Sequence, residues 1–273
     1  MELPNTRRFF IAPAALRGDE LLLADQALAH QLARVLRLGP GDRVLLLDGL
    51  GSACELELMA LTRAEVAGRV LWRGPAGGEP PVELIVYLAL MRAERFEWAI
   101  QKCVELGARR VVPVQFARSL PADRADDHKL ERWRRIMREA AEQACRGLLP
   151  DLAPPLTFAA ACEQASQSTL ALILWEGEAP HLRTLLRPQP SALVPHPSSL
   201  STLPDALSTQ HSALSTLPST LALLSGPVGG ITPDELTAAR QHGIMPASLG
   251  PRILRAETAP IAALAAILYE LEA

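Results

Sequence analysis

The spacing of hydrophobic and polar positions predicts a small β-rich unit at the start of the chain. Residues 25–38, DQALAHQLARVLRL, have apolar positions at helical spacing and lead into the turn residues GPGD. The apolar face of this helix is formed by Leu28, Leu32, Val35 and Leu36. Three short strand candidates follow, RVLLLDG, ACELELMAL and AEVAGRVLW, separated by turn residues. We therefore expect residues 1–73 to form a small β-rich domain with one helix.

The pattern changes after residues 74–81, GPAGGEPP, which have lost periodicity and predict a linker. VELIVYLALM (82–91) is a continuous apolar run, as expected of a strand buried on both faces. A helical stripe, a strand at 110–116 and an amphipathic helix at 129–144 come next. The inward positions of these two helices are Phe96, Ile100, Cys103 and Val104, then Leu130, Trp133, Met137, Ala140 and Ala144. TLALILWE, TLALLSGP and MPASLG predict further strands, and Pro260–Leu271 a closing helix, so residues 82–273 indicate a mostly parallel α/β sheet.

One segment, Pro188–Thr220, breaks this alternation. It is rich in Pro, Ser, Thr and Leu, has almost no charge, and repeats LSTLP at 200–204 and 214–218. Such a composition predicts a low-complexity insertion, interpreted as a surface loop. A partner-binding motif is the alternative interpretation.

Composition adds limits on location and chemistry. No apolar run reaches the roughly 18–20 residues that cross a bilayer, and the start MELPNTRRFFIAP lacks the apolar stretch of a signal peptide, so we expect a cytosolic protein. Four cysteines, without any CxxC pair, and six scattered histidines predict no metal site. We expect the cysteines to be reduced and structural, with Cys103 and Cys145 on apolar helix faces.

The net charge of −3 gives no overall sign of nucleic-acid binding. Its distribution is more informative, because residues 92–146 contain 13 Lys and Arg against 9 Asp and Glu. A solvated helix face and an RNA-binding surface both explain that excess.

A first glycine-containing loop, SGPVGGITPDE (225–235), follows a buried strand candidate. Thr232 has the pattern of an N-cap, Pro233 of the first helical position, and Glu235 completes a capping box. A loop between a strand and a helix N-terminus often holds a nucleotide-like ligand. A tight structural turn remains the alternative.

A second loop, SLGPRILRAETAP (248–260), places Arg252, Arg255, Glu257 and Thr258 before an apolar, alanine-rich helix. A solvated helix end with a Glu–Arg pair is the alternative interpretation. Because charges beside a buried helix are expensive unless they are paired or used, we expect residues 248–258 to belong to the functional centre of an enzyme. Dinucleotide-binding, P-loop and nucleophile-elbow motifs are absent from the sequence.

Together these blocks resemble the RsmE family of 16S ribosomal RNA methyltransferases, of the SPOUT class. The resemblance rests on GPVGG and SLGPRILRAETA, on RRFF, HQLARVLRLGPGD and LLLDG, and on the stretches at 91–119 and 129–146. It implies an α/β, SPOUT-like trefoil-knotted domain with a mostly parallel sheet, and a small N-terminal PUA-like β-barrel domain. It also implies S-adenosylmethionine as cofactor and action as a homodimer. The cofactor-binding residues that it implies are Trp175, Glu176, Leu224, Gly226, Gly230, Leu249, Gly250, Ile253 and Leu254.

The implied reaction is methylation at N3 of a specific uridine in 16S rRNA of the 30S ribosomal subunit. Because the neutral imide is a poor nucleophile, a catalyst must align N3 and stabilise or remove charge. We expect Arg255 to stabilise uracil O4 or O2, Glu257 to orient that arginine or accept the proton, and Thr258 to cap the last helix. Candidate RNA contacts are Arg7, Arg8, His30, Arg34, Arg37, Arg92, Arg95, Lys102, Arg118 and Arg146.

Three departures from the family pattern bear on activity. Val228 stands where the family's first loop usually has glutamate, arginines replace lysines at Arg92 and Arg95, and Leu148 occupies an often basic position. Two other functions therefore stay open: a SPOUT methyltransferase with a different RNA substrate, and a catalytically silent RNA-binding or ribosome-assembly factor.

Overall fold

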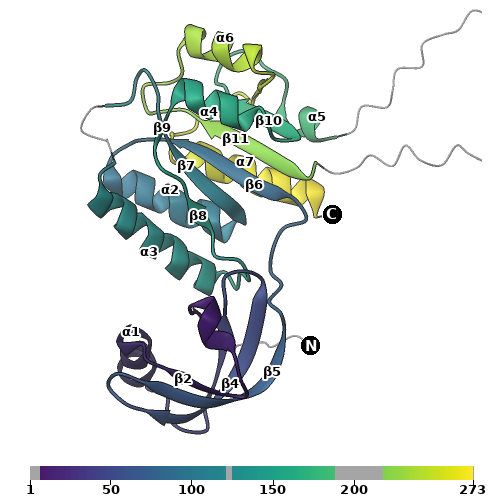
Figure 1. Ribbon diagram of the computed structural model, residues 1–273. Helices are drawn as coiled ribbons and strands as arrows, with labels where there is room; N and C mark the ends of the chain where they lie inside the picture. Colours follow the sequence, from purple (N-terminus) through teal and green to yellow (C-terminus); the bar gives the residue numbers. More distant parts are fainter. Residues whose placement is uncertain (1–6, 121–124, 188–217, 273) are drawn as a thin grey trace, which may run out of the picture.

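The computed structural model describes residues 7–120, 125–187 and 218–272, which form two sheets (Figure 1). The first sheet is curled and has the order β1-β3-β4-β5-β2. Its strands are β1 (Arg8–Phe10), β2 (Glu20–Leu23), β3 (Arg43–Leu47), β4 (Ser52–Leu61) and β5 (Val66–Pro75). β1 runs parallel to β3, and the other pairs are antiparallel. Within the described residues β1 and β2 remain edges, so the predicted barrel is a half-barrel.

The helix expected at 25–38 is real but irregular. Asp25 caps α1 (Gln26–His30) by accepting a hydrogen bond from Leu28 N at 2.9 Å. A wider π-helical turn (Gln31–Val35) then replaces the α-helix. Because this turn takes more residues, the helical register rotates: Leu28 and Leu32 are buried, whereas Val35 is 65% exposed. The expectation that Val35 faces the core was wrong. A short 3₁₀ turn, Pro13–Leu16, precedes β2.

The second sheet confirms the predicted parallel α/β fold. It has the order β12-β10-β11-β6-β7-β8, β9 also pairs with β7, and all these pairs are parallel. Its strands are β6 (Glu83–Ala89), β7 (Ala108–Gln115), β8 (Asp151–Leu152), β9 (Leu156–Thr157), β10 (Leu170–Leu174), β11 (Thr220–Ser225) and β12 (Met245–Ala247). β8 and β9 have two residues each, too few to give a periodic signal. The knot implied by the resemblance stays a prediction.

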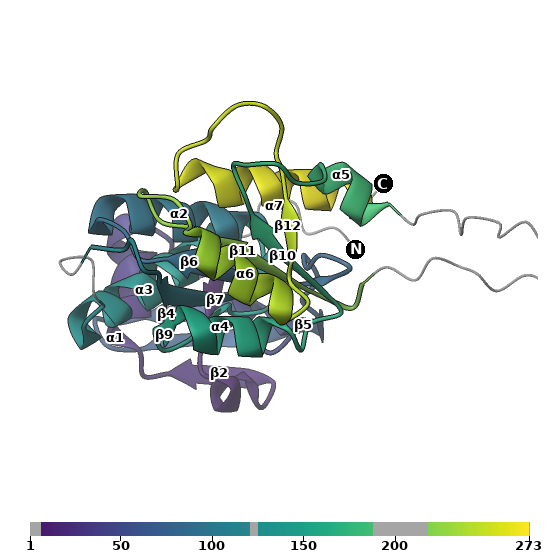
Figure 2. The same cartoon turned by 90° about the horizontal axis from the view of Figure 1, so that it is seen from above.

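Helices cover both faces of this sheet, as the view from above shows (Figure 2). One face carries α2 (Ala93–Glu105), α3 (Asp127–Gln143), α5 (Leu182–Leu186) and α7 (Thr258–Leu271). The other carries α4 (Phe158–Ala165) and α6 (Pro233–Gln241). In β6, Val86 packs into the first layer and Tyr87 into the second, so this strand is apolar at nearly every position.

The predicted stripes of α2 and most of α3 face the core, where the rings of Phe96 and Trp133 lie 4.2 Å apart. At the end of α3 the prediction was wrong. Cys145 is exposed and has a φ of 59°, because the helix has already ended at Gln143. Ala144 is the C-cap and only half-buried.

A buried ion pair links the segment between the sheets to the end of α3. Arg146 is 1% exposed and contacts Glu79 Oε2 at 2.5 Å. Its Nη1 also donates to the carbonyl oxygens of Val104 and Ala108. Glu79 Oε1 accepts from Gly147 N and Leu148 N, both at 3.0 Å. The prediction that Arg146 contacts RNA is therefore corrected: its guanidinium is enclosed and holds the linker.

Further contacts join β1 to α3. Phe10 N donates to Glu142 Oε1 at 3.0 Å, and Arg138 Nη1 donates to Phe10 O at 2.9 Å. Burial raises the pKa of Glu142, although the bond from Phe10 and the charge of Arg138 oppose that shift. Phe10, Leu45 and Leu47 share one hydrophobic cluster with the residues of α2 and α3. One side of the first sheet thus packs into the core of the second, while the other side has a separate hydrophobic cluster that includes Leu32 and Leu46.

The insertion expected at 188–220 lies mostly outside the described residues, and its last residue, Thr220, begins β11. Just before it, Arg183 and Arg187 of the α5 region contact Glu270 of α7 at 2.7 and 3.1 Å. The hydrogen bond from Arg183, with that from Arg187, lowers the pKa of Glu270. None of the described helices is long and apolar enough to cross a bilayer.

Arg146→Ala is expected to lower the free energy of unfolding by about 3 kcal/mol, because it leaves Glu79 without its buried partner. Arg69→Ala breaks the exposed Arg69–Glu57 pair, 2.8 Å apart, and serves as the matched control. That change should cost less than about 1 kcal/mol. Urea unfolding of both variants measures the difference, and equal losses would contradict the structural role of Arg146.

Candidate active site

A cavity of about 370 Å³ opens at the carboxyl ends of β10, β11 and β12. These strands are neighbours, so the chain segments that leave them meet at one edge of the sheet. The predicted cofactor-binding residues that line the cavity are Trp175, Glu176, Gly226, Gly230, Leu249, Gly250, Ile253 and Leu254. Leu224 does not line it. It is fully buried in β11 and packs on the α4 and α6 side, because alternate residues of a strand face opposite layers.

The first loop needs its glycines. A Cβ on Gly226 would lie 2.5 Å from Ile231 Cγ1, and Gly230 has a φ of +76°. The predicted capping box that follows is present. Glu235 N donates to Thr232 Oγ1 at 3.2 Å, and Glu235 Oε2 accepts from Thr232 N at 2.9 Å. Glu235 Oε1 also accepts from Ala117 N at 2.7 Å, which ties this loop to the end of β7.

Arg118, predicted to contact RNA, lies against this first loop. Its Nη1 donates to Gly229 O at 2.9 Å while the side chain stays exposed. Arg118 therefore braces the loop that lines the cavity.

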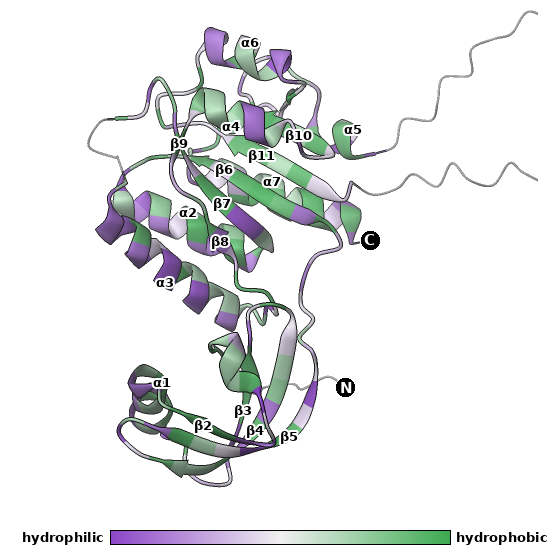
Figure 3. Ribbon diagram, viewed as in Figure 1, coloured by the Kyte–Doolittle hydropathy of each residue, from purple (hydrophilic) through white to green (hydrophobic). Residues whose placement is uncertain are grey.

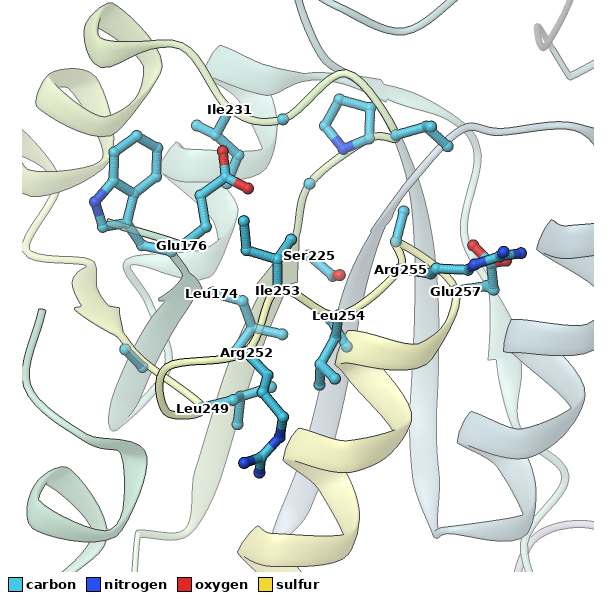
Figure 4. A pocket seen from close by; sticks show the side chains of 18 of the residues that line it. Leu174, Glu176, Ser225, Ile231, Leu249, Arg252, Ile253, Leu254, Arg255 and Glu257 are labelled. Carbon is cyan, nitrogen blue, oxygen red and sulfur yellow. The ribbon is translucent and has the colours of Figure 1, made fainter. Parts of the chain in front are cut away.

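Backbone hydrogen bonds hold the start of the second loop. Trp175 N donates to Ala247 O, Ser248 N to Pro180 O, and Leu182 N to Ser248 O, at 2.8 to 3.0 Å. Gly250 then has a φ of +103°, and a Cβ placed on it would meet nothing within 4 Å. This glycine thus faces open space, and Ile253, 78% exposed, lies further along the cavity wall (Figure 4).

The charged end of the cavity is formed by Arg255, Glu257 and Arg95. Glu257 is 9% exposed, and its Oε1 lies 3.7 Å from Arg95 Nε. Its Oε2 is buried and has no hydrogen-bond partner among the described residues. In Figure 4, Arg255 and Glu257 lie at one side of the cavity, while Arg252 points away from them. A buried carboxylate oxygen without a partner is a group that a ligand can satisfy.

Two roles differ from the sequence predictions. Thr258 is the first residue of α7 and does not line the cavity; the N-cap is Glu257, without a side-chain capping bond, so the expected cap at Thr258 was wrong. Arg95 was expected only as an RNA contact, yet it belongs to the cavity wall. The order of elements could have indicated this position. The helix α2, which carries Arg95, follows β6, and β6 lies beside β11, so α2 begins at the edge of the sheet where the cavity lies.

Two further residues that line the cavity, Ser225 and Val228, were not among the predicted site residues. Ser225 is 1% exposed at the end of β11. Val228, noted as a departure from the family pattern, is 63% exposed at the cavity edge. Its apolar side chain therefore has no packing role in the core.

The remaining RNA candidates lie on two surfaces. His30, Arg34 and Arg37 are exposed around the π-helical turn, and Arg7 Nη1 donates to Leu36 O at 3.2 Å. Arg8 Nη1 donates to Cys145 O at 3.1 Å, so it lies between β1 and α3. Arg92 is exposed at the start of α2, whereas Lys102 contacts Glu105 Oε1 at 2.7 Å. Their contact with RNA stays a prediction.

The cysteines carry no nucleophilic chemistry in the cavity. Cys54, Cys103 and Cys162 are buried, and burial raises the pKa of the Cys103 thiol to about 12. No group of three or more His, Cys, Asp or Glu side chains suited to a metal occurs in the described part of the chain.

Comparisons with known proteins give the family. A model described as an RNA methyltransferase domain matches residues 78–268. The chain is 35% identical over 269 residues to ribosomal RNA small subunit methyltransferase E of Synechocystis sp., with 97% of this chain and 78% of that protein covered. The chain belongs to this methyltransferase family. The resemblance inferred from the sequence is thus confirmed.

Solved structures agree with membership in the methyltransferase E family. The member from Neisseria gonorrhoeae, bound to S-adenosyl methionine, is 27% identical with a TM-score of 0.77, covering 96% of this chain and 97% of that one. A methyltransferase from Legionella pneumophila in complex with the same cofactor is 25% identical with a TM-score of 0.77 and the same coverage of both chains.

Gly250→Ala is expected to weaken binding of S-adenosylmethionine at least about tenfold, because alanine at this φ displaces the second loop. Gly243→Ala is the matched control: Gly243 also has a positive φ, +75°, and open space around it, but it does not line the cavity. Both variants should lose some stability, whereas isothermal titration should show weaker binding only for Gly250→Ala. Equal affinity in the two variants would exclude the second loop from the binding site.

Proposed function

We propose that the chain transfers a methyl group from S-adenosylmethionine to N3 of a specific uridine in 16S rRNA of the small ribosomal subunit. The names of its relatives support the substrate class, and the two cofactor-bound structures support the cofactor. The observation that carries the proposal is the cavity itself, in which two glycine loops meet the buried carboxylate of Glu257 and the side chains of Arg95 and Arg255.

The cavity fits the cofactor in size and in chemistry. Its volume of about 370 Å³ lies within the range of small-molecule sites. The open backbone at Gly250 and the aliphatic side chains of Leu249, Ile253 and Leu254 form one wall. Trp175 and Glu176 stand at the end of β10 on another side. When bound there, the sulfonium supplies an electrophilic methyl group.

The charged residues at one end suit the nucleophile. The N3 proton of uracil has a pKa well above neutrality, so attack requires removal of that proton or stabilisation of the charge that develops on O2 and O4. In this mechanism Arg255 donates hydrogen bonds to one of those oxygens. Glu257 Oε2, buried and without a partner among the described residues, accepts the N3 proton or orients Arg255. Arg95 holds the other oxygen of Glu257 in place.

We infer that the working unit is a homodimer joined through α7. Ala263, Leu264, Ile267 and Leu271 of this helix face the core. Its opposite side is also apolar but exposed, with Tyr269 75% exposed and Ala265 and Ala266 beside it. A second copy of the chain would cover this surface, and a cytoplasmic location follows from the ribosomal substrate.

Arg255→Ala and Glu257→Gln should each lower kcat by about 10²- to 10³-fold, because the first removes the donor to the uracil oxygen and the second removes the carboxylate that accepts the proton or orients Arg255. Their affinity for S-adenosylmethionine should stay close to that of the wild type. Arg240→Ala, an exposed change at the end of α6, is the control and should keep full activity. A retained rate with intact cofactor binding in either site variant would remove that residue from the mechanism.

Mass mapping of methyl groups on 16S rRNA from a strain that lacks this chain tests the substrate. Loss of one N3-methyluridine, restored by the wild-type gene but not by Arg255→Ala, is the expected result. An unchanged 16S pattern together with cofactor binding would indicate a different RNA substrate. Failure to bind S-adenosylmethionine in isothermal titration would indicate a silent RNA-binding factor.

A further inference from the structure

A groove of about 840 Å³ lies outside the cavity, along the solvent side of α3. One wall is this helix, from His128 to Arg138, and the other is the segment Leu149–Leu152 that leads into β8. Its charged lining consists of Arg132, Arg134, Arg135 and Arg138 against the carboxylates of Glu131 and Asp151. Hydrophilic residues recur along the exposed side of α3 (Figure 3).

The contacts of these arginines show which of them are paired within the protein and which can contact a ligand. Arg132 contacts Glu97 of α2 at 2.7 Å, which explains its position by helix packing alone. The Arg134 side chain has no hydrogen bond or ion pair with any residue that the structure describes. Arg135 lies 3.8 Å from Glu139, but both side chains are about two-thirds exposed, so this pair is weak. Arg138 donates to Phe10 O, a neutral acceptor, and its charge is partly balanced by the carboxyl of Glu142.

Some exposed arginines elsewhere on the chain have carboxylate partners. Arg69 has Glu57 at 2.8 Å, and both Arg183 and Arg187 contact Glu270. In the groove, by contrast, Arg134 and Arg138 lie four residues apart, a spacing at which like charges repel in a helix. A helix face that only contacts solvent gains nothing from two like charges at this spacing, whereas a bound anion reduces the repulsion between them.

The groove adjoins the basic residues of the first sheet. Arg138 bonds Phe10 of β1, and Arg8, two residues earlier on the same strand, bonds Cys145 just after α3. Arg7 in turn bonds Leu36, between Arg34 and Arg37. The basic residues of α3 and those of the half-barrel therefore lie along one connected path.

We propose that this groove binds the phosphate backbone of the RNA substrate, an inference that rests on the proposed function. The groove lining has no Phe, Tyr or Trp ring for base stacking and no Asn or Gln side chain that reads a base edge. Its arginines are spaced about one helical turn apart, which suits successive contacts with a polyanionic strand. The groove holds and orients the RNA, while the uridine is chosen at the cavity.

The test compares the charge-removing double variant R134Q/R135Q with the control R63Q/R240Q in the full-length chain. All four arginines are exposed and the charge change is equal, but Arg63 and Arg240 lie outside the groove. Binding of protein-free, in vitro transcribed 16S rRNA is measured by fluorescence anisotropy between 50 and 300 mM salt. Titration with S-adenosylmethionine reports on folding.

R134Q/R135Q should bind the RNA about tenfold more weakly at 0.1 M salt, and the slope of log K against log salt should fall by about 1.5. KM for RNA should rise while kcat and cofactor affinity stay unchanged. The same affinity and slope in R134Q/R135Q and the control would overturn the proposal, even if the wild type methylates 16S rRNA. Weaker binding in R134Q/R135Q with no methylation by the wild type would support the groove and reject the proposed function. A loss seen only with intact 30S subunits would indicate a protein partner and overturn the RNA assignment.

Discussion

The parallel pairing of β12 with β10 determines where the site forms. Three residue pairs, from Leu172 with Met245 to Leu174 with Ala247, are enough to bring the second glycine loop to the edge where the first one already lies. The backbone bond from Trp175 to Ala247 extends that pairing into the loops. Because α7 then returns across α2, Glu257 arrives beside Arg95. The cavity thus depends first on main-chain geometry and only then on the side chains that line it.

The buried ion pair between Arg146 and Glu79 fixes how the half-barrel packs on the large sheet. Burial of a charge is unfavourable, and Arg146 is tolerated because Glu79 and two carbonyl oxygens satisfy its guanidinium. Glu79 in turn anchors the amides of Gly147 and Leu148. The segment that composition marks as a linker is therefore held at its middle, and β1 is kept against α3. In this way Arg8 of β1 and Arg138 of α3 come to lie along the same junction.

Features that depend on local chemistry were predictable from the sequence. The parallel sheet followed from apolar runs alternating with amphipathic helices, and the capping box of α6 followed from Thr232 and Glu235. The two glycine loops were also recognised, and their convergence is confirmed. Predictions failed where a distant partner decides the role of a residue: Arg146 looked like a surface arginine until Glu79 enclosed it. Val35 failed for a different reason, since a π-helical turn rotates the register without any sequence mark that distinguishes it from an α-helix.

The junction between α5 and β11 has a consequence for how the chain changes over evolution. The described chain ends on one side at Arg187, held by Glu270, and resumes on the other at the amino end of β11, where Thr169 N bonds Thr220 Oγ1 at 2.9 Å. The cavity lies at the opposite, carboxyl end of that strand. Each end of the junction has its own anchor, so residues can be gained or lost between them without moving a catalytic group. The same position suits the insertion of a tag or a fluorophore into a working enzyme.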